Sequence, residues 1–598
     1  MKKLLAIVLA VLMLVPVMLT ACGESEENEN SGAEVQMFLT TLPQNLDPSA
    51  SYTTVDNIRI MGLIFEGLTK IDEDGKLENA LCKSYEYEFD ERTGHLDLFI
   101  SLKNSRWSDG NLVTAEDFRF AWKRILLPEN NNSNAALLYP VLNAKKAKEG
   151  LCSIDDIGVY ALTNSLLQIR LDKEYVNEDD FTKGEIKDQV EYFMRRLASP
   201  ALVPLREDVV DDNTKEWCTP NGSSYVTNGP FKIRAWNSGE LTFERCVNYE
   251  CVGDNTENAK DSVVKPYKLI TLYTDGPSAT EHYEKFKKTK SFYINLNSAS
   301  EEVVKKVKDD IETDNLLSTY CVYLDTEHSL FADVRVRQAL SLALNRNDIA
   351  KKTNNIAATG FVPEGVEDTD RKSSFREVGG DLISTKANIA KAKKLLEEAG
   401  VNPARHVIAI DYSNDKVADE YIANACEAAW GKEGLGFKIQ ATSKTQKFIN
   451  SKEHGDYPLN QTHESIDAAT VILVNLQSQT SDAYSILTSF SGEFGGTFVD
   501  VTIDDVVYDA HVTGFMDEKY DDICSEFIIT KSPSYRATAM HIAEEYLVEQ
   551  MPVIPVVFNQ ASYITQELSK YESDKFGRLN FTELKQKNYE DYLEKTSK

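Results

Sequence analysis

The cysteines are the residues of this chain whose number and spacing bear most directly on chemistry. Nine are present, and one of them, Cys22, follows directly after an apolar stretch near the start of the chain. An oxidising compartment would permit disulfides among the others, whose even number is compatible with pairing. No C-x-x-C spacing occurs, so the sequence indicates neither a redox pair nor a cysteine-rich zinc site, although Cys246 and Cys251 are near enough to close a small loop. The eight are Cys82, Cys152, Cys218, Cys246, Cys251, Cys321, Cys426 and Cys524.

Other reactive side chains do not form a catalytic pattern. The eight histidines are scattered, and the sequence contains no H-E-x-x-H, G-x-S-x-G, G-x-x-x-x-G-K or G-x-G-x-x-G motif. Residues 72–75 (DEDG) lack the alternating ligands and the distal glutamate of a calcium loop, so a polar turn is the better interpretation. The sequence therefore predicts a protein that is not an enzyme, with no catalytic residue, no metal site and no cofactor.

The first residues predict an export signal. Two lysines precede an apolar stretch from Leu4 to Leu19, and small residues end it directly before Cys22. The cysteine at this cut site resembles a bacterial lipobox, in which it becomes the lipidated first residue of the mature protein. A transmembrane anchor is the alternative, because spanning needs only about 17 apolar residues, but Pro16 and the cysteine argue against it. We expect residues 1–21 to be the signal peptide and Cys22 to carry the lipid that anchors the protein outside the cytoplasmic membrane.

The amino-acid composition indicates what the segment after the signal peptide and the rest of the chain can form. Residues 22–33 contain four glutamates and no large apolar side chain, which predicts a flexible tether. The 598-residue chain is 42% hydrophobic, enough for two to four compact units of about 100–200 residues each. Its formal net charge of −30 disfavours nucleic acid and anionic lipid surfaces as partners.

Helix and strand patterns mix along the body. Alternating apolar residues predict strands at 35–39 and 96–102, and an apolar run between prolines predicts a buried strand at 551–558. Thr114 and Asp117 form a capping box that opens a helix, and helical spacing of apolar residues predicts another helix over Val417–Trp430. Because helices and strands are mixed along the chain and not grouped separately, the pattern predicts the α/β fold class.

Seven short motifs together resemble the extracellular oligopeptide- and dipeptide-binding proteins of bacterial ABC importers. Each motif alone is weak, but all occur in the family's order over most of the mature chain. We expect them mainly to build the scaffold as turns and caps. They are Leu46-Asp47-Pro48; Ile64-Phe65-Glu66-Gly67-Leu68; Trp107-Ser108-Asp109-Gly110 with Thr114-Ala115-Glu116-Asp117; Asn228-Gly229-Pro230-Phe231 with Trp236; Asp333-Val334-Arg335-Val336-Arg337-Gln338-Ala339-Leu340 with Asn345-Arg346; Gly360-Phe361-Val362-Pro363; and Met551-Pro552-Val553-Ile554-Pro555.

The resemblance implies a type II periplasmic-binding-protein fold, which is a two-lobed α/β clamshell with an extra subdomain on lobe one. Lobe one would comprise residues 34–75, 205–318 and 553–598, with residues 76–204 as the extra subdomain. Lobe two would comprise residues 319–552. The chain would then cross the hinge twice, near Thr319 to Leu324 and near Val553 to Phe558.

The resemblance also implies a ligand site in the cleft between the lobes, where an extended peptide would lie as an added strand. Backbone hydrogen bonds would hold the peptide while wet, roomy pockets accept its side chains, so many sequences would fit. On lobe one, Tyr52, Thr53 and Thr54 match the family's contact segment. Tyr139 falls where a cleft aromatic is expected, although its ring could equally belong to the subdomain core, and Phe558 is a further candidate.

On lobe two the sequence departs from the family's pattern. Peptide binders of this family carry a Trp-x-x-Asp-Tyr-x-x-Pro-like segment whose aspartate meets the α-ammonium of the peptide. The matching region, residues 471–484, lacks the Trp and Pro. Asp482 aligns best with the second acidic position, and Gln479 or a neighbour takes the anchoring one. Asn475 and Gln477 are the other polar candidates, and they would suit a neutral polar ligand.

These observations predict a lipid-anchored receptor that captures peptides and delivers them to an ABC permease. The alternative within the same fold is a receptor for another solute, such as a metal chelate, an oligosaccharide or a signalling peptide. A surface enzyme and a chaperone or adhesin are the remaining alternatives. We expect a monomer whose partners are the solute, the permease subunits and the membrane, and not nucleic acid.

Overall fold

A computed structural model of the chain describes residues 33–586 with several gaps. The gaps are residues 40–41, 50–54, 177–182, 215, 221–224, 238–239, 250–263, 265, 273–278, 289–290, 298, 370, 415–416, 446–447, 450–467, 497–498, 504–505 and 530–531. Cys22, Tyr52, Thr53 and Thr54 therefore lie outside the described residues. Within the described part, no helix combines the length and the apolarity that crossing a membrane requires.

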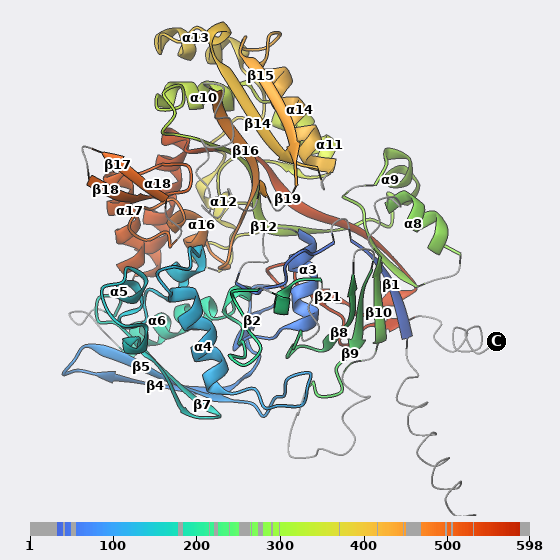
Figure 1. Cartoon of the computed structure of the whole chain (residues 1–598), viewed down its shortest axis with the longest axis vertical. Helices are drawn as coiled ribbons and strands as arrows, with labels where there is room; N and C mark the ends of the chain where they lie inside the picture. Colours follow the sequence, from blue (N-terminus) through green and yellow to red (C-terminus); the bar gives the residue numbers. More distant parts are fainter. Residues whose placement is uncertain are drawn as a thin grey trace, which may run out of the picture.

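A mixed sheet runs through the molecule and joins its two halves (Figure 1). Its order is β15-β14-β16-β12-β19-β11-β1-β10-β9-β8, with β13 paired to β19. In chain order the strands are β1 (Ala33–Phe38), β8 (Phe231–Asn237), β9 (Glu240–Arg245), β10 (Pro266–Leu272), β11 (Phe292–Asn295), β12 (Glu312–Leu324), β13 (Ile356–Ala357), β14 (Val407–Ser413), β15 (Lys438–Lys444), β16 (Ala468–Gln477) and β19 (Val553–Gln566). We call the part with β1 and β8–β11 the first half, and the part with β14–β16 the second half.

Two long strands, β12 and β19, connect the halves. The residues Glu312–Asn315 of β12 pair with Gln560–Tyr563 of β19, and β19 pairs from Tyr563 onward with β11 in the first half. After a shift in register between Asn315 and Thr319, β12 pairs with the start of β19 and with β16 in the second half. The segments at which the sequence predicted hinge crossings, 319–324 and 553–558, lie in this paired region.

Side chains of β12 alternate between two hydrophobic cores in the second half. Cys321 and Tyr323 enter one core, whereas Val322 and Leu324 enter the other, as the two-residue period of a strand requires. The helices and strands around these cores are α10 (Val334–Ala343), α11 (Arg346–Thr353), α12 (Phe375–Gly379), α13 (Ile389–Glu398), η5 (Pro403–Arg405), α14 (Val417–Trp430), α16 (Tyr484–Thr488), β17 (Val499–Ile503), β18 (Val506–Ala510), α17 (Glu518–Ile529) and α18 (Pro533–Gln550). The helix predicted over Val417–Trp430 is thus confirmed as α14.

A separate four-stranded sheet, β4-β5-β7-β6, forms a subdomain with the helices packed on it (Figure 1). The alternating burial along β5 confirms the strand predicted at 96–102. The capping box at Thr114 is also present, since the Asp117 carboxylate accepts the Thr114 backbone N–H at 2.7 Å. The elements are β4 (Cys82–Asp90), β5 (His95–Leu102), α4 (Ala115–Leu126), η1 (Ser133–Leu138), α5 (Ala144–Lys148), η2 (Ile154–Asp156), β6 (Val159–Thr163), β7 (Leu166–Leu171), α6 (Lys183–Arg196), η3 (Pro200–Leu202) and η4 (Glu216–Cys218).

The first half is completed by short helices and hairpins. Gly229 lies against the end of α3, where a Cβ would come within 2.5 Å of the Ile64 carbonyl carbon, so only glycine fits there. Beside it, the Asn228 side chain bonds both backbone groups of Glu66, at 3.1 and 2.8 Å. These contacts give the Asn-Gly motif a structural role, which is to hold this turn against the end of α3. The remaining elements are α3 (Val55–Ile64), β2 (Thr69–Ile71), β3 (Leu77–Asn79), α8 (Ala279–Phe286), α9 (Glu301–Val307), β20 (Leu568–Ser569), β21 (Glu572–Ser573), β22 (Leu579–Asn580) and β23 (Lys585–Gln586).

The small cysteine loop considered from the sequence receives no support in the described part of the chain. Cys246 is a buried free thiol, and its considered partner Cys251 lies outside the described residues. Burial raises the pKa of the Cys246 thiol, which keeps it protonated and unreactive.

Candidate functional site

The candidate site lies where β16 leaves the sheet of the second half. β16 pairs with β14 only as far as Ile472, whereas its pairing with β12 continues to Gln477. From Leu473 to Gln477, the edge of β16 that faces away from β12 therefore has no strand partner among the described residues. A free strand edge offers backbone donors and acceptors in alternation, which is the arrangement that an added strand can use.

A turn of hydroxyl side chains follows this edge and leads into α16. Ser478, Thr480 and Ser485 are joined by their hydroxyl groups, with Ser478 Oγ 2.9 Å and Thr480 Oγ1 3.2 Å from Ser485 Oγ. Ser485 Oγ also accepts the backbone N–H of Gln479 at 2.8 Å. Because each hydroxyl both donates and accepts, the network holds the backbone of residues 478–485 in one conformation.

Three amide side chains along this segment each have one buried atom without a hydrogen-bond partner. Asn475 Oδ1 accepts a hydrogen bond from Asn559 Nδ2 at 2.6 Å, but Asn475 Nδ2 has no partner. Gln477 Nε2 donates to the carbonyls of Leu317 and Ser478, but Gln477 Oε1 has no partner, and neither has Gln479 Oε1. An unsatisfied buried polar atom costs about 1–3 kcal/mol, so three in one segment indicate a place where a ligand can bond.

These three side chains supply one donor and two acceptors at alternate positions of the chain. Asn475 and Gln477 follow Val471 and Leu473 on the same face of β16, beyond the end of the core that these two residues enter. A peptide backbone carries both donors and acceptors and can satisfy such a set. A neutral polar solute can do so as well.

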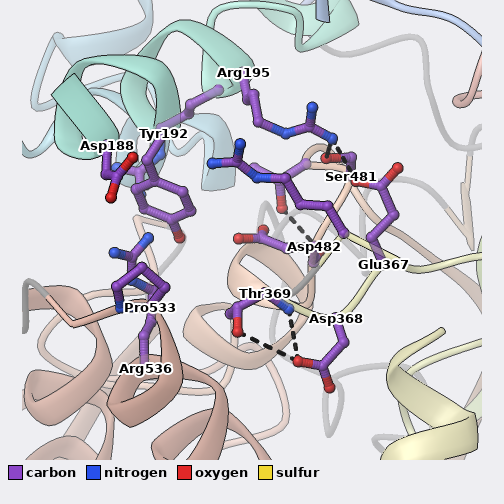
Figure 2. A pocket seen from close by; sticks show the side chains of 13 residues that line it. Asp188, Tyr192, Arg195, Glu367, Asp368, Thr369, Ser481, Asp482, Pro533 and Arg536 are labelled. Atoms are coloured by element: carbon purple, nitrogen blue, oxygen red, sulfur yellow. Dashed lines mark hydrogen bonds and ion pairs between the residues drawn. The ribbon is translucent and has the colours of Figure 1, made fainter. Parts of the chain in front are cut away.

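Asp482 lies at the end of the segment and lines a small cavity. Its Oδ1 accepts the backbone N–H of Tyr484 at 3.2 Å. The cavity has a volume of about 30 Å³ and lies where α6 of the subdomain meets the second half (Figure 2). Its lining residues are Asp188, Tyr192, Arg195, Arg196, Glu367, Asp368, Thr369, Arg371, Thr480, Ser481, Asp482, Pro533 and Arg536.

Two of the sequence-predicted ligand residues are buried. Tyr139 is 2% exposed within the subdomain core, and this position favours the core interpretation over that of a cleft aromatic. Phe558 is also 2% exposed, and its backbone pairs with Thr319 of β12 and Ile356 of β13.

Direct contacts join the subdomain to the second half. Arg195 of α6 forms a buried ion pair with Glu367, and its Nη2 donates to Ser481 Oγ at 3.2 Å. Tyr484 Oη donates to the carbonyl of Ala136 in η1 at 3.2 Å. The two bodies therefore meet around the candidate segment.

Sequence patterns did not reveal the basic side chains at this junction. Arg196 lies with its Cζ 3.9 Å from the ring centre of Tyr484, and Arg536 with its Cζ 3.7 Å from that of Tyr192. Burial by itself lowers the pKa of the Arg196 guanidinium. Tyr484, Tyr192 and Asp482 raise this pKa by more than burial lowers it, so it lies above its ordinary value. These residues are far apart in the chain, and no local motif could have identified them.

Comparison with known proteins identifies the family. Residues 76–482 match the bacterial extracellular solute-binding proteins, family 5, which is about two thirds of the chain. The chain belongs to this family. It is 25% identical to the oligopeptide-binding protein OppA of Bacillus subtilis over 589 residues, which cover 95% of this chain and 96% of OppA. It is 26% identical to the dipeptide-binding protein DppE of the same organism, covering 88% of this chain and 87% of DppE.

Solved structures of the family agree with the fold. Haemophilus influenzae OppA in complex with the peptide RPPGFSPFR matches with a TM-score of 0.72 and 20% identity, over 93% of this chain and 99% of the other. The predicted α/β class and type II periplasmic-binding-protein fold are thus confirmed. As a family 5 member the chain is a solute-binding transport protein, of a family that works outside the cytoplasm and does not consist of enzymes.

Proposed function

We propose that this chain is a receptor that captures peptides between its two halves and delivers them to an ABC permease. The observation that carries the proposal is the free edge of β16 beside Asn475, Gln477 and Gln479, whose buried amide atoms lack partners. A peptide lying along this edge would bond to it as an added strand and satisfy those atoms. The names of the relatives, which bind oligopeptides and dipeptides, support the same ligand class.

The proposed receptor works by closing on its ligand. In this proposal lobe one comprises residues 34–75, 205–318 and 553–598 with the extra subdomain at 76–204, and lobe two comprises residues 319–552. β12 and β19 would form the hinge, since they alone among the strands of the sheet extend far into both halves. A ligand that touches both lobes favours the closed population, because only the closed form makes both sets of contacts. The receptor would act as a monomer.

Peptide capture can be tested directly on the purified mature protein. We expect native mass spectrometry after incubation with a mixture of tripeptides to nonapeptides to show bound peptide. We also expect X-ray scattering to show a smaller radius of gyration in the bound state, because closure compacts the molecule. If no peptide in the mixture binds at millimolar concentration, the proposal fails.

A lipid at Cys22 would hold the receptor at the outer face of the cytoplasmic membrane. Two or more acyl chains anchor a protein stably, where a single chain does so only marginally. In the Cys22→Ser variant of the full chain, we expect the mature protein in the medium or an uncleaved precursor. Cell fractionation and the mass of the mature N-terminus measure this. A variant that stays membrane-bound at the mature size and resists carbonate extraction would contradict the anchor.

A receptor for a neutral polar solute, such as an oligosaccharide, is the second candidate. The same three amides favour it, since Gln479 or a neighbour takes the position where the resemblance expects a carboxylate, and Gln479 is neutral. Hydroxyl groups of a sugar could satisfy one donor and two acceptors as well as a peptide backbone could. Mass spectrometry of the solute that co-purifies with the protein distinguishes the two candidates.

A further inference from the structure

Two buried arginines differ from all the others in the described part of the chain. Ten arginines there are at most 9% exposed. Eight of them bond a carboxylate or a backbone carbonyl through the guanidinium: Arg59, Arg124, Arg195, Arg245, Arg337, Arg346, Arg376 and Arg578. Arg196 and Arg536, at 5% and 3% exposure, have no such bond, and Arg196 Nη1 and Arg536 Nε are buried without any partner.

The two arginines that bond neither a carboxylate nor a backbone carbonyl lie at one place. Both guanidinium groups lie near the ring of Tyr192, with Cζ to ring-centre distances of 5.3 Å for Arg196 and 3.7 Å for Arg536. Figure 2 shows the Tyr192 ring reaching from α6 toward Arg536 on α18. Arg196 thus belongs to the subdomain and Arg536 to the second half, and both line the same cavity of about 30 Å³.

The carboxylates around this cavity do not neutralise the pair by direct contact. Glu367 is already paired with Arg195, and Asp368 lies 2.7 Å from His541 Nε2. Asp188 is exposed and Asp482 is half-buried, and neither carboxylate lies within the 4.0 Å of an ion pair from the guanidinium of Arg196 or Arg536. Arg371 also lines the cavity and is paired with Glu191. Two buried cations therefore remain without a directly bonded anion, which is costly in a folded protein.

We propose that Arg196 and Arg536 together bind one carboxylate group. Guanidinium groups match the planar geometry of a carboxylate and bond it in a bidentate manner. A cavity of about 30 Å³ has room for one such group but not for a whole peptide. The carboxylate is either a small free anion or a carboxylate of the captured solute, since Thr480, Ser481 and Asp482 of the candidate segment line the same cavity.

The bound carboxylate would favour closure. It would bond one arginine of the subdomain and one of the second half, so its binding is strongest when the two bodies are in contact. The solute-derived source rests on the proposed peptide-binding function, whereas the free-anion source does not. The two arms of the experiment below separate these sources.

The first arm measures a free carboxylate without any peptide. At constant ionic strength, sodium acetate should raise the melting temperature of the mature protein in a saturable way. In Arg536→Gln, and separately in Arg196→Gln, we expect the apparent acetate affinity to fall at least tenfold. The control is Arg335→Gln, which removes the same charge from a half-exposed arginine that does not line the cavity and should leave the acetate response unchanged.

The second arm measures a carboxylate of the solute. It compares RPPGFSPFR with the same peptide carrying a C-terminal amide, by calorimetry in a buffer without small carboxylates. If the solute supplies the group, amidation should weaken binding at least tenfold, acetate should compete with the free acid, and Arg536→Gln should remove the difference. Loss of folding is checked by circular dichroism, and Arg196→Gln serves as the second variant if Arg536→Gln unfolds.

Two results would overturn the inference. One is the absence of both effects, with no saturable acetate response and equal affinity for the acid and the amide. The other is an equal loss of either effect in Arg335→Gln, which would assign it to general charge. Peptide capture without either carboxylate effect contradicts this inference alone, and an acetate response without peptide capture contradicts only the proposed function.

Discussion

Replacing Glu544 by alanine should lower the free energy of unfolding by about 3–5 kcal/mol, the cost of leaving a buried charge and its donors without a partner. The Glu544 side chain is fully buried and forms an ion pair with Arg376. One of its oxygens also accepts the backbone N–H groups of Phe361 and Val362, at 2.8 and 2.9 Å. The alanine variant would leave Arg376 without its carboxylate and both N–H groups buried without an acceptor.

The measurement is urea denaturation followed by tryptophan fluorescence, with the m-value used to test whether both proteins unfold in the same way. Glu545→Ala is the matched control, because the neighbouring glutamate is exposed and its loss should change stability by no more than about 0.5 kcal/mol. Equal stability of Glu544→Ala and Glu545→Ala would contradict the role assigned to the buried carboxylate.

This ion pair also explains one of the family motifs in physical terms. A Cβ at Gly360 would overlap both Arg376 and Glu544, so a side chain at this position would displace the ion pair. The next two residues then present their N–H groups to the carboxylate. The Gly-Phe-Val-Pro motif thus forms a turn whose backbone N–H groups bind the carboxylate of Glu544, a residue more than 180 positions away in the chain. The sequence could indicate the motif but not its partner.

Local patterns in the sequence predicted local structure well. The capping box at Thr114, the strand at 96–102 and α14 all depend on residues within a few positions of each other, and all three are present. The buried strand predicted at 551–558 is the start of β19, and the strand predicted at 35–39 is β1. Hydrophobic periodicity and capping are short-range effects, which a single sequence contains in full.

The candidate site depends on long-range contacts, and there the sequence was less informative. An aromatic residue has the same appearance in a sequence whether it lines a cleft or fills a core, and only the structure shows that Tyr139 and Phe558 are both 2% exposed. The importance of Arg196 and Arg536 comes from the carboxylates that are not beside them, which only the packed structure can show. The segment from Asn475 to Asp482 could be found because its departure from the family's pattern is local.

The neutral side chain of Gln479 should have a large effect on how the protein distinguishes free from acetylated peptide amino ends. If this residue faces the amino end of a bound peptide, the wild-type protein offers the α-ammonium an amide oxygen instead of a carboxylate, and Gln479 Oε1 is buried without another partner. We therefore expect little preference between a free and an N-acetylated form of the same peptide. In Gln479→Asp, the free form should bind about tenfold to a hundredfold more tightly than in the wild type, because bonds to charged groups contribute about 1.5–3 kcal/mol.

Calorimetric titration with free and acetylated RPPGFSPFR measures both expectations. Gln479→Asn is the matched control, since it has the length of aspartate without its charge and should not create the preference. The acetylated peptide should bind Gln479→Asp less well than the wild type, because an unpaired carboxylate would then remain buried. A strong preference of the wild type for the free amine would instead assign the anchoring role to another carboxylate, with Asp482 nearest along the segment. The wild type and Gln479→Asp thus differ mainly in the charge at position 479. The hydroxyl groups of Ser478, Thr480 and Ser485 hold the backbone around this position in place.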